Sequence, residues 1–129
     1  MKVLITGAAG FIGGFLVRHC AEAGSAVLGV DVREPENAWG NAAFERCDVR
    51  DSSRLSELIA AFRPDCIFHL AAQSYPTVSL RRPLETMETN VGGTISLFES
   101  VRASGLMPTV VVACSSAEYG LVASDDLPV

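Results

Sequence analysis

Three glycines at three-residue intervals follow the first apolar run of the chain. Residues 3–5 form that run and predict a buried strand; Gly7, Gly10 and Gly13 come next, and a helical pattern covers residues 11–23. Each glycine costs backbone entropy, so such a series indicates a backbone that must stay bare. In a strand–turn–helix unit the first glycine permits a tight turn, and the missing side chains let a pyrophosphate approach. The last glycine lets the helix pack close to the strand.

Short apolar runs alternate with helical stretches along the rest of the chain. Strands are predicted at residues 3–5, 26–30, 43–47, 66–70 and 109–113, and helices at residues 11–23, 51–62 and 83–103. Strands joined through helices by right-handed crossovers form a parallel sheet with both faces covered. The pattern therefore predicts an α/β fold, a Rossmann-type doubly wound parallel sheet with the strand order 3-2-1-4-5.

Composition excludes several classes of protein. Hydrophobic residues make up 49% and charged residues 19% of 129 residues, which indicates one globular domain. The net charge of -5 argues against partners such as nucleic acid or an acidic membrane surface. No signal peptide or membrane-spanning stretch is predicted, and the four cysteines occur singly, without the paired spacing of a metal or redox site. We therefore expect buried thiols, no bound metal and a cytoplasmic protein.

An acidic residue follows the second predicted strand. Asp31 is placed to accept hydrogen bonds from both hydroxyls of an adenosine ribose, and its charge would repel a 2′-phosphate. The cofactor predicted from this residue is NAD. Arg33 lies two residues later and offers a partner for a 2′-phosphate, so NADP stays open as an alternative.

The glycine spacing is G-x-x-G-x-x-G rather than the G-x-G-x-x-G of ordinary dehydrogenases. With Thr6 before it and Phe11-Ile12 inside it, the stretch resembles the extended short-chain dehydrogenase/reductases, the NAD-dependent epimerase/dehydratase family. Four further stretches resemble motifs of that family in the same order. They are Cys47-Asp48-Val49-Arg50-Asp51, His69-Leu70-Ala71-Ala72-Gln73-Ser74, Asn90-Val91-Gly92-Gly93-Thr94 and Ser115-Ser116-Ala117-Glu118-Tyr119-Gly120. The resemblance covers the whole chain.

The resemblance implies where a cofactor lies. Residues 48 and 49 would contact adenine, and the turn at residues 69–74 would lie against the cofactor ribose. The expected cofactor-binding residues are Gly7, Gly10, Phe11, Ile12, Gly13, Asp31, Arg33, Asp48, Val49, Leu70, Ala71, Ala72 and Gln73, with Ser74 expected at the substrate.

The resemblance also implies an acid/base residue that this sequence does not contain. In the family a Tyr moves the proton, with a Lys four residues later, and a Ser or Thr hydroxyl holds the same oxygen. Neither Tyr75 nor Tyr119 has a Lys at that spacing. We therefore expect residues 1–129 to be a Rossmann domain truncated before this pair and before the substrate-binding part, and to be inactive alone.

The catalytic hydroxyl is expected at Ser116. Aligning Ser116-x-Glu118 with the Thr-x-Glu of the family's dehydratases gives this register, and alignment from the strand side gives Ser115 instead. Glu118 would be the proton-abstracting base of a dehydratase. A solvated carboxylate is an equal alternative, because a reductase needs no such base.

Residues 72–74 and 115–120 look most like the branch of the family that makes and reduces GDP-4-keto-6-deoxymannose. Its dehydratases usually carry Gln-Asp-Gly where this chain has Phe11-Ile12-Gly13, so a reductase is favoured. A GDP-mannose 4,6-dehydratase and an NDP-sugar 4-epimerase are the alternatives. A non-catalytic NAD(P)-binding module or an inactive fragment is the alternative from another class. The resemblance further implies a nucleotide-sugar substrate and, for the full-length protein, a homodimer.

Three other residues have plain structural interpretations. His69, at the end of an apolar strand, is expected to be a satisfied core histidine rather than a catalyst. Asn90 is expected to order backbone or water rather than touch substrate. Trp39 is expected to anchor a loop, with a cover over the cofactor as the alternative.

Overall fold

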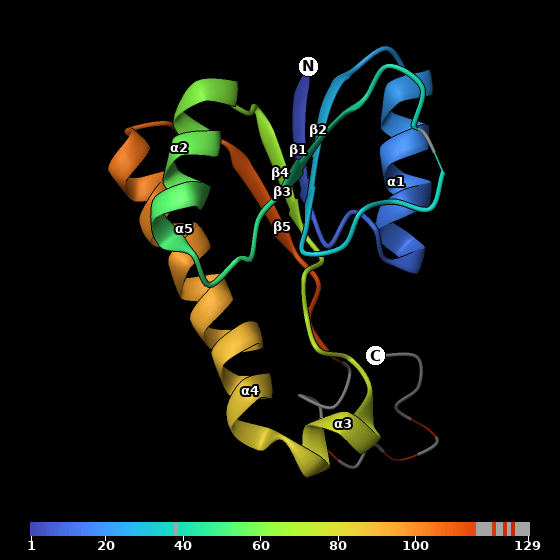
Figure 1. Cartoon of the computed structure of the whole chain (residues 1–129), viewed down its shortest axis with the longest axis vertical. Helices are drawn as coiled ribbons and strands as arrows, with labels where there is room; N and C mark the ends of the chain where they lie inside the picture. The colour runs from blue at the N-terminus through green and yellow to red at the C-terminus, as the bar shows by residue number, and fades with distance from the viewer. Residues whose placement is uncertain (38, 116–119, 121–122, 124, 126–129) are drawn as a thin grey trace.

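A single five-stranded parallel sheet forms the centre of the molecule (Figure 1). The computed structural model describes residues 1–37, 39–115, 120, 123 and 125. The strands are β1 (Lys2–Thr6), β2 (Ala26–Asp31), β3 (Ala43–Arg46), β4 (Cys66–His69) and β5 (Thr109–Val112), and the spatial order is β3-β2-β1-β4-β5. All four strand pairs are parallel, so the predicted architecture and strand order are confirmed.

Helices cover both faces of this sheet. The helices against the sheet are α1 (Phe11–Glu22), α2 (Ser52–Phe62) and α5 (Gly93–Ser104). Before α5 come α3 (Pro76–Arg81), α4 (Pro83–Met87) and the π-helix η1 (Glu88–Gly92), of which α3 and α4 lie beyond the lower end of the sheet in Figure 1. In Figure 1, α1 lies on one face and α2 and α5 lie on the other. Side chains of β1 alternate between two cores: Val3 and Ile5 pack toward α1, and Leu4 packs toward α2 and α5. The two-sided burial explains why the central strands are continuous apolar runs.

The boundaries of α2 and α5 follow ordinary capping chemistry. The Asp51 carboxylate accepts a hydrogen bond from the Arg54 amide at 3.0 Å, as an N-cap does. Left-handed residues terminate both helices, Arg63 with φ 54° after α2 and Gly105 with φ 66° after α5.

Two helical features differ from the prediction. A short helix, α3, occupies a segment for which no element was predicted; Pro76 at its first position was the available signal. The helix predicted at residues 83–103 runs as α4, η1 and α5 in succession, with a π-turn at its centre. There the Thr94 hydroxyl donates a hydrogen bond to the Asn90 carbonyl at 2.6 Å. A side chain thus bonds a carbonyl oxygen that in a regular helix accepts only from a backbone N–H.

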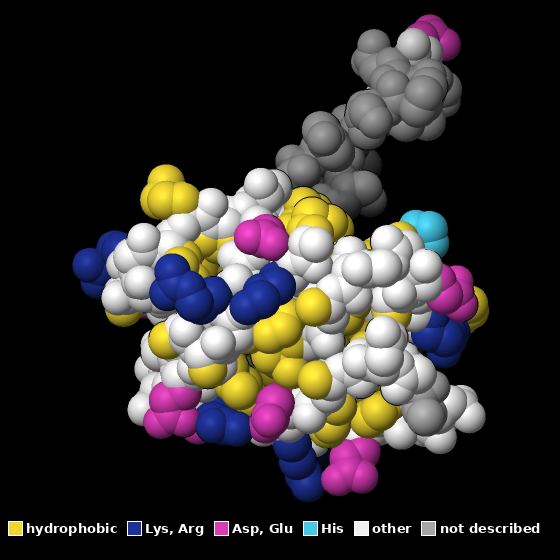
Figure 2. Space-filling model, turned by 90° about the horizontal axis from the view of Figure 1, so that it is seen from above, with side chains coloured by type: hydrophobic (Ala, Val, Ile, Leu, Met, Phe, Trp, Pro, Cys, Tyr) yellow, Lys and Arg dark blue, Asp and Glu magenta, His cyan; other side chains and the backbone are white. Residues whose placement is uncertain are grey.

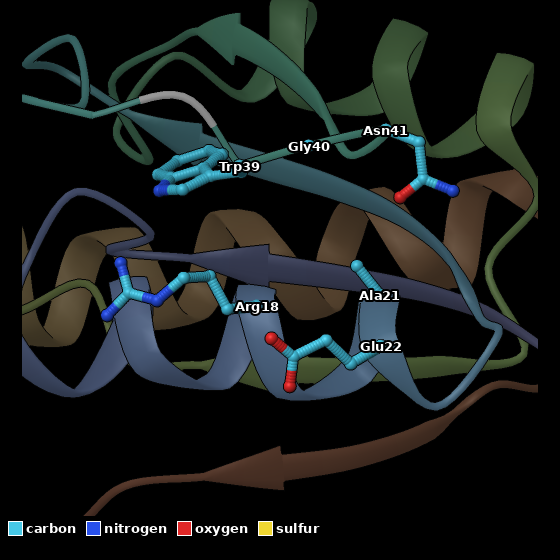
Figure 3. Close-up of a pocket in the computed structure, with 6 residues that line it drawn as sticks. All are labelled: Arg18, Ala21, Glu22, Trp39, Gly40 and Asn41. Atoms are coloured by element: carbon cyan, nitrogen blue, oxygen red, sulfur yellow. The ribbon is translucent and has the colours of Figure 1, made fainter.

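Trp39 anchors the loop before β3, as predicted. The indole is buried over Gly29 of β2, where an added Cβ would lie 2.4 Å from the ring, and it meets Phe44 edge to face. Figure 3 shows the indole above α1, next to a pocket of about 210 Å³ that residues 39–41 and the C-terminal half of α1 line. Because Trp39 belongs to the core, the structure gives no support to its alternative role as a cofactor cover.

The expectation of buried thiols is only partly correct. Cys47 and Cys66 are buried and Cys20 is half-buried, but Cys114 is exposed just beyond β5. Burial raises the pKa of the Cys47 thiol to about 11, with nearby Asp51 adding to the shift. In the part of the chain that the structure describes, no helix has the length and apolar character needed to cross a membrane.

Gly13 and Gly14 are neighbours in α1 that should respond oppositely to substitution. An added Cβ at Gly13 would lie 2.2 Å from the Gly7 carbonyl oxygen, whereas at Gly14 it would lie 3.7 Å from the Ala8 carbonyl oxygen. We predict that Gly13→Ala lowers the free energy of unfolding by about 1–3 kcal/mol through overpacking. Gly14→Ala should raise it by about 0.5–1 kcal/mol through reduced chain entropy. Urea denaturation of both variants measures the difference, and a Gly13→Ala protein as stable as wild type would contradict it.

Candidate functional site

The carboxyl ends of the parallel strands meet at one edge of the sheet. β1 ends at Thr6, β2 at Asp31 and β4 at His69, and their exit turns lie toward the lower end of the sheet in Figure 1. In open α/β sheets this edge is where ligands bind, at the point where strand order reverses between β1 and β4. The structure therefore brings the predicted cofactor-binding turns together.

The turn after β1 rests directly on the turn after β4. Gly7 has φ +71°, and a Cβ there would lie 2.7 Å from the Leu70 carbonyl carbon and the Ala71 nitrogen. From the other side, Gly13 packs α1 against the Gly7 carbonyl. Both steric roles predicted for these glycines, the tight turn and the close helix, are confirmed.

Gly10 differs from Gly7 and Gly13 in its surroundings. It is the N-cap of α1 with ordinary extended backbone, φ -77° and ψ 172°, and an added Cβ would approach only the Gly7 carbonyl oxygen, at 3.1 Å. The first-turn amides of α1, from Phe11 onward, have no carbonyl partner inside the helix. Among the described residues, no side chain caps this helix end. Such an N-terminus fits an anion such as a pyrophosphate.

Asp31 holds the glycine turn in place. Its side chain is 8% exposed; Oδ2 accepts from the Ala9 amide and Oδ1 accepts from the Arg33 amide, each at 3.0 Å. The Arg33 side chain is 72% exposed, with Nε 3.9 Å from Oδ1. A carboxylate has about four acceptor positions, so two remain for further donors such as ribose hydroxyls. The tie to Ala9 was not foreseen from the sequence.

The turn after β3 carries an ion pair. Arg50 binds Asp48 through several hydrogen bonds, the shortest at 2.6 Å, and this bonding holds the pKa of the Asp48 carboxyl below its usual value. Arg50 also reaches Glu88 of η1 at 3.7 Å, beside a hollow of about 440 Å³. Val49 is buried, and the Gly93 backbone lies against its side chain. Contacts of residues 48 and 49 with adenine remain predictions.

Asn90 clamps the turn after β4. Its Oδ1 accepts from the Gln73 amide at 2.7 Å, and its Nδ2 donates to the Gln73 carbonyl at 3.2 Å. This confirms the prediction that Asn90 orders backbone. In the same turn Ala72 and Ser74 are exposed, so their side chains face outward beside the bound backbone.

His69 is buried and bonded through both ring nitrogens. Nδ1 lies 2.7 Å from the Thr6 hydroxyl, and Nε2 lies 3.1 Å from the Thr94 hydroxyl. Burial lowers the pKa of this imidazole below its ordinary value of 6.5. The prediction of a satisfied core histidine is confirmed. The sequence analysis did not foresee that Thr6 and Thr94 bind this ring, although the hydroxyl of Thr6 at the end of β1 was a usable signal.

The predicted catalytic group is described only in part. Ser115 follows β5 at the same edge and is exposed. Ser116 and Glu118 lie outside the described residues, so their roles stay predictions. The described residues contain no group of three or more His, Cys, Asp or Glu side chains that could hold a metal ion.

Sequence comparison identifies the class of protein that this fold and edge define. The sequence pattern of the NAD dependent epimerase/dehydratase family matches residues 3–128, nearly the whole chain. The chain belongs to this family.

Relatives of this chain are named for different reactions. The chain is 33% identical over 129 residues to CDP-paratose 2-epimerase of Salmonella typhi, covering 93% of this chain and 38% of that protein. It is 35% identical to UDP-glucose 4-epimerase of Mycolicibacterium smegmatis, covering 100% of this chain and 45% of that protein. The chain thus spans less than half the length of these relatives.

A solved structure shows the same fold. UDP-glucose-4-epimerase from Stenotrophomonas maltophila, with bound NAD and formylated UDP-arabinopyranose, superposes with a TM-score of 0.89 at 29% identity. The match covers 100% of this chain and 40% of that chain.

Proposed function

We propose that this chain binds NAD across the β1–α1 turn, as the cofactor-binding part of a nucleotide-sugar oxidoreductase. The observation that carries the proposal is the contrast among the three glycines. Gly7 and Gly13 are packed closely against backbone, whereas Gly10 is the half-buried N-cap of α1, beside first-turn amides that have no carbonyl partner in the helix. An added Cβ at Gly7 or Gly13 would lie within 3.0 Å of backbone atoms, whereas at Gly10 it would make one tight contact, 3.1 Å from the Gly7 carbonyl oxygen. Packing therefore demands glycine less strictly at the middle position, where the lack of a side chain suits a phosphate group.

In this proposal some residues bind the cofactor and others orient it. The amides of Phe11, Ile12 and Gly13 would hold the pyrophosphate, and Asp31 would orient the adenosine ribose with its remaining acceptor positions. When bound, the nicotinamide supplies hydride transfer. Ser116, or Ser115 in the alternative register, would hold the sugar oxygen next to the transferred hydride.

The finer proposal is a GDP-4-keto-6-deoxymannose reductase. The support is the likeness of residues 72–74 and 115–120 to that branch, and the Phe11-Ile12-Gly13 where its dehydratases carry Gln-Asp-Gly. A 4,6-dehydratase or a 4-epimerase is the second candidate, because relatives with both kinds of name match the chain. A cytoplasmic location belongs to the same proposal.

A homodimer of the longer protein is also proposed. Apolar side chains at three- and four-residue spacing remain exposed along α4, η1 and α5, namely Leu84, Met87, Val91, Ile95 and Phe98. Such a stripe supports association with another helical surface. Side chains of both charge signs surround apolar ones on the face shown in Figure 2. A monomer in sedimentation velocity would contradict the proposal.

Gly10→Val should weaken cofactor binding while the protein still folds, with only a small local shift at the Gly7 carbonyl, 3.1 Å from the added Cβ. The backbone of Gly10 suits any residue, but the side chain would occupy the space expected for the phosphates. We expect the dissociation constant for NAD to rise at least about tenfold, or about 1.4 kcal/mol. Calorimetric titration measures it, with Gly14→Ala as a matched glycine control in the same helix. Wild-type affinity in Gly10→Val would refute the proposed phosphate position.

Asp31→Asn should relax a preference for NAD over NADP. The amide removes the charge facing a 2′-phosphate but keeps an oxygen that can accept from Ala9. Asp31→Ala removes both, so it should weaken binding of both cofactors by loosening the turn. Titrations with each cofactor separate the two effects. If wild type already prefers NADP strongly, Arg33 dominates and the assignment of NAD is wrong.

The oxidoreductase itself is tested by nicotinamide absorbance with GDP-4-keto-6-deoxymannose as substrate. We expect turnover by the full reading frame and none by residues 1–129, because losing proton transfer alone typically costs about 10²–10⁴-fold. Equal rates would mean that the active site is misplaced. A full-length protein inert on all nucleotide sugars tested would favour a binding module.

A further inference from the structure

A continuous set of hydrogen bonds runs from the sheet to the turn after β4. We call it the His69 relay; it consists of Thr6, His69, Thr94, Asn90 and the backbone of residues 71–73. At one end the Thr6 hydroxyl accepts from the Ala71 amide at 3.3 Å. At the other end Thr94 bonds the Asn90 carbonyl, and the Asn90 side chain binds both backbone groups of Gln73. The imidazole is the link between the two ends.

The partners assign a direction to every bond in the His69 relay. Thr94 donates its one proton to the Asn90 carbonyl at 2.6 Å, so its oxygen must accept from His69 Nε2–H. His69 Nδ1 then carries no proton and accepts from the Thr6 hydroxyl at 2.7 Å. The Thr6 oxygen remains free to accept from the Ala71 amide. Only a neutral imidazole with its proton on Nε2 satisfies the whole set.

The surroundings of His69 favour the neutral ring. The imidazole is 3% exposed. The neighbouring residues from β1, β5 and α5 are Thr6, Val112 and Thr94, and none of them titrates. Among the described residues, no charged group contributes to the lowered pKa of His69, which burial alone causes. Protonation would put a second N–H opposite the Thr6 hydroxyl and break the order of donors.

We propose that His69 is a positioning residue that fixes the 71–73 turn for cofactor binding, through Thr6 on one side and Thr94 and Asn90 on the other. This inference rests on the proposed function, because the turn is expected to lie against the cofactor ribose. The His69 relay spans β1, β4, η1 and α5, which separates it from ordinary packing of one side chain. A residue that only fills space in the core would need the volume of the imidazole ring but not its two hydrogen-bonded nitrogens.

Two substitutions at His69 separate positioning from packing. A Gln amide carries one acceptor and one donor, so His69→Gln can keep both bonds without a titrating ring, whereas His69→Leu keeps neither. Ser100→Ala is the matched control. Ser100 is buried in α5, donates to the Ser52 carbonyl at 3.3 Å and accepts from Ser56 at 2.9 Å. Both of these partners belong to α2 rather than to the turn after β4. Its loss should lower stability without changing the turn.

The first readout is calorimetric titration of NAD into the whole 129-residue chain. We expect His69→Leu to weaken binding about tenfold, the scale of one lost buried hydrogen bond, and Gln to restore most of it. The NAD affinity of wild type should stay level through pH 6.5 and fall only in more acidic solution, once the pH drops beneath the lowered pKa of His69 and the ring takes up a proton. The affinity of His69→Gln should lack this acid-dependent fall. Ser100→Ala should bind NAD like wild type. Equal affinity in wild type and His69→Leu overturns the proposal, as does a Gln variant no better than Leu.

The second readout needs no cofactor. Hydrogen exchange of the Ala71 and Gln73 amides should accelerate in His69→Leu, beyond any change in Ser100→Ala, and unchanged protection overturns the proposal. If His69→Leu does not fold, Thr94→Val breaks the same link, and Thr94→Ser should restore it. If wild type binds no NAD, the proposed function fails, and amide exchange alone decides whether His69 positions the turn.

Discussion

The contact between the turns after β1 and β4 is the constraint on which the site depends. Gly7 is left-handed and lies against the backbone of Leu70 and Ala71, where a Cβ would overlap. Gly13 then seats α1 on the same Gly7 carbonyl. A side chain at either glycine would move the helix N-terminus away from the sheet edge and the β4 turn. The position of the first-turn amides of α1 is therefore set by backbone packing.

Buried polar side chains complete this edge from two sides. Asp31 reaches across from β2 to the Ala9 amide, and His69 joins β4 to Thr6 and Thr94. Burying a neutral polar group such as His69 without a partner would cost on the order of 1–3 kcal/mol, and burying the charged Asp31 carboxylate without one would cost more. Within the described residues, every buried side-chain nitrogen and oxygen has a partner. The same bonds that satisfy these groups hold the turns in one arrangement, so stability and preorganisation have a common origin here.

Strand order and the glycine roles were predictable because each depends on a local pattern with one structural solution. Apolar runs and right-handed crossovers lead to 3-2-1-4-5, and bare positions mark close backbone contacts. The π-turn was not predictable, because it depends on how the Thr94 hydroxyl meets the Asn90 carbonyl in three dimensions. The His69 relay was missed for the same reason: a threonine at the end of a strand and another in a helix are common, and only the fold shows that Thr6 of β1 and Thr94 of α5 flank one imidazole.

In the function proposed above, the described edge would bind and orient a dinucleotide, but its described residues include no Tyr followed four residues later by a Lys for proton transfer. This division of roles would explain why two relatives named for different reactions, a 2-epimerase and a 4-epimerase, are 33% and 35% identical to this segment. The glycine turn, Asp31 and the His69 relay would act on parts of a dinucleotide that are the same in all of these reactions. Specificity for one sugar must then come from residues that face the substrate. Within this sequence the residues expected to face the substrate are Ser74, which is exposed after β4, and the stretch that begins at Ser115, after the neighbouring strand β5.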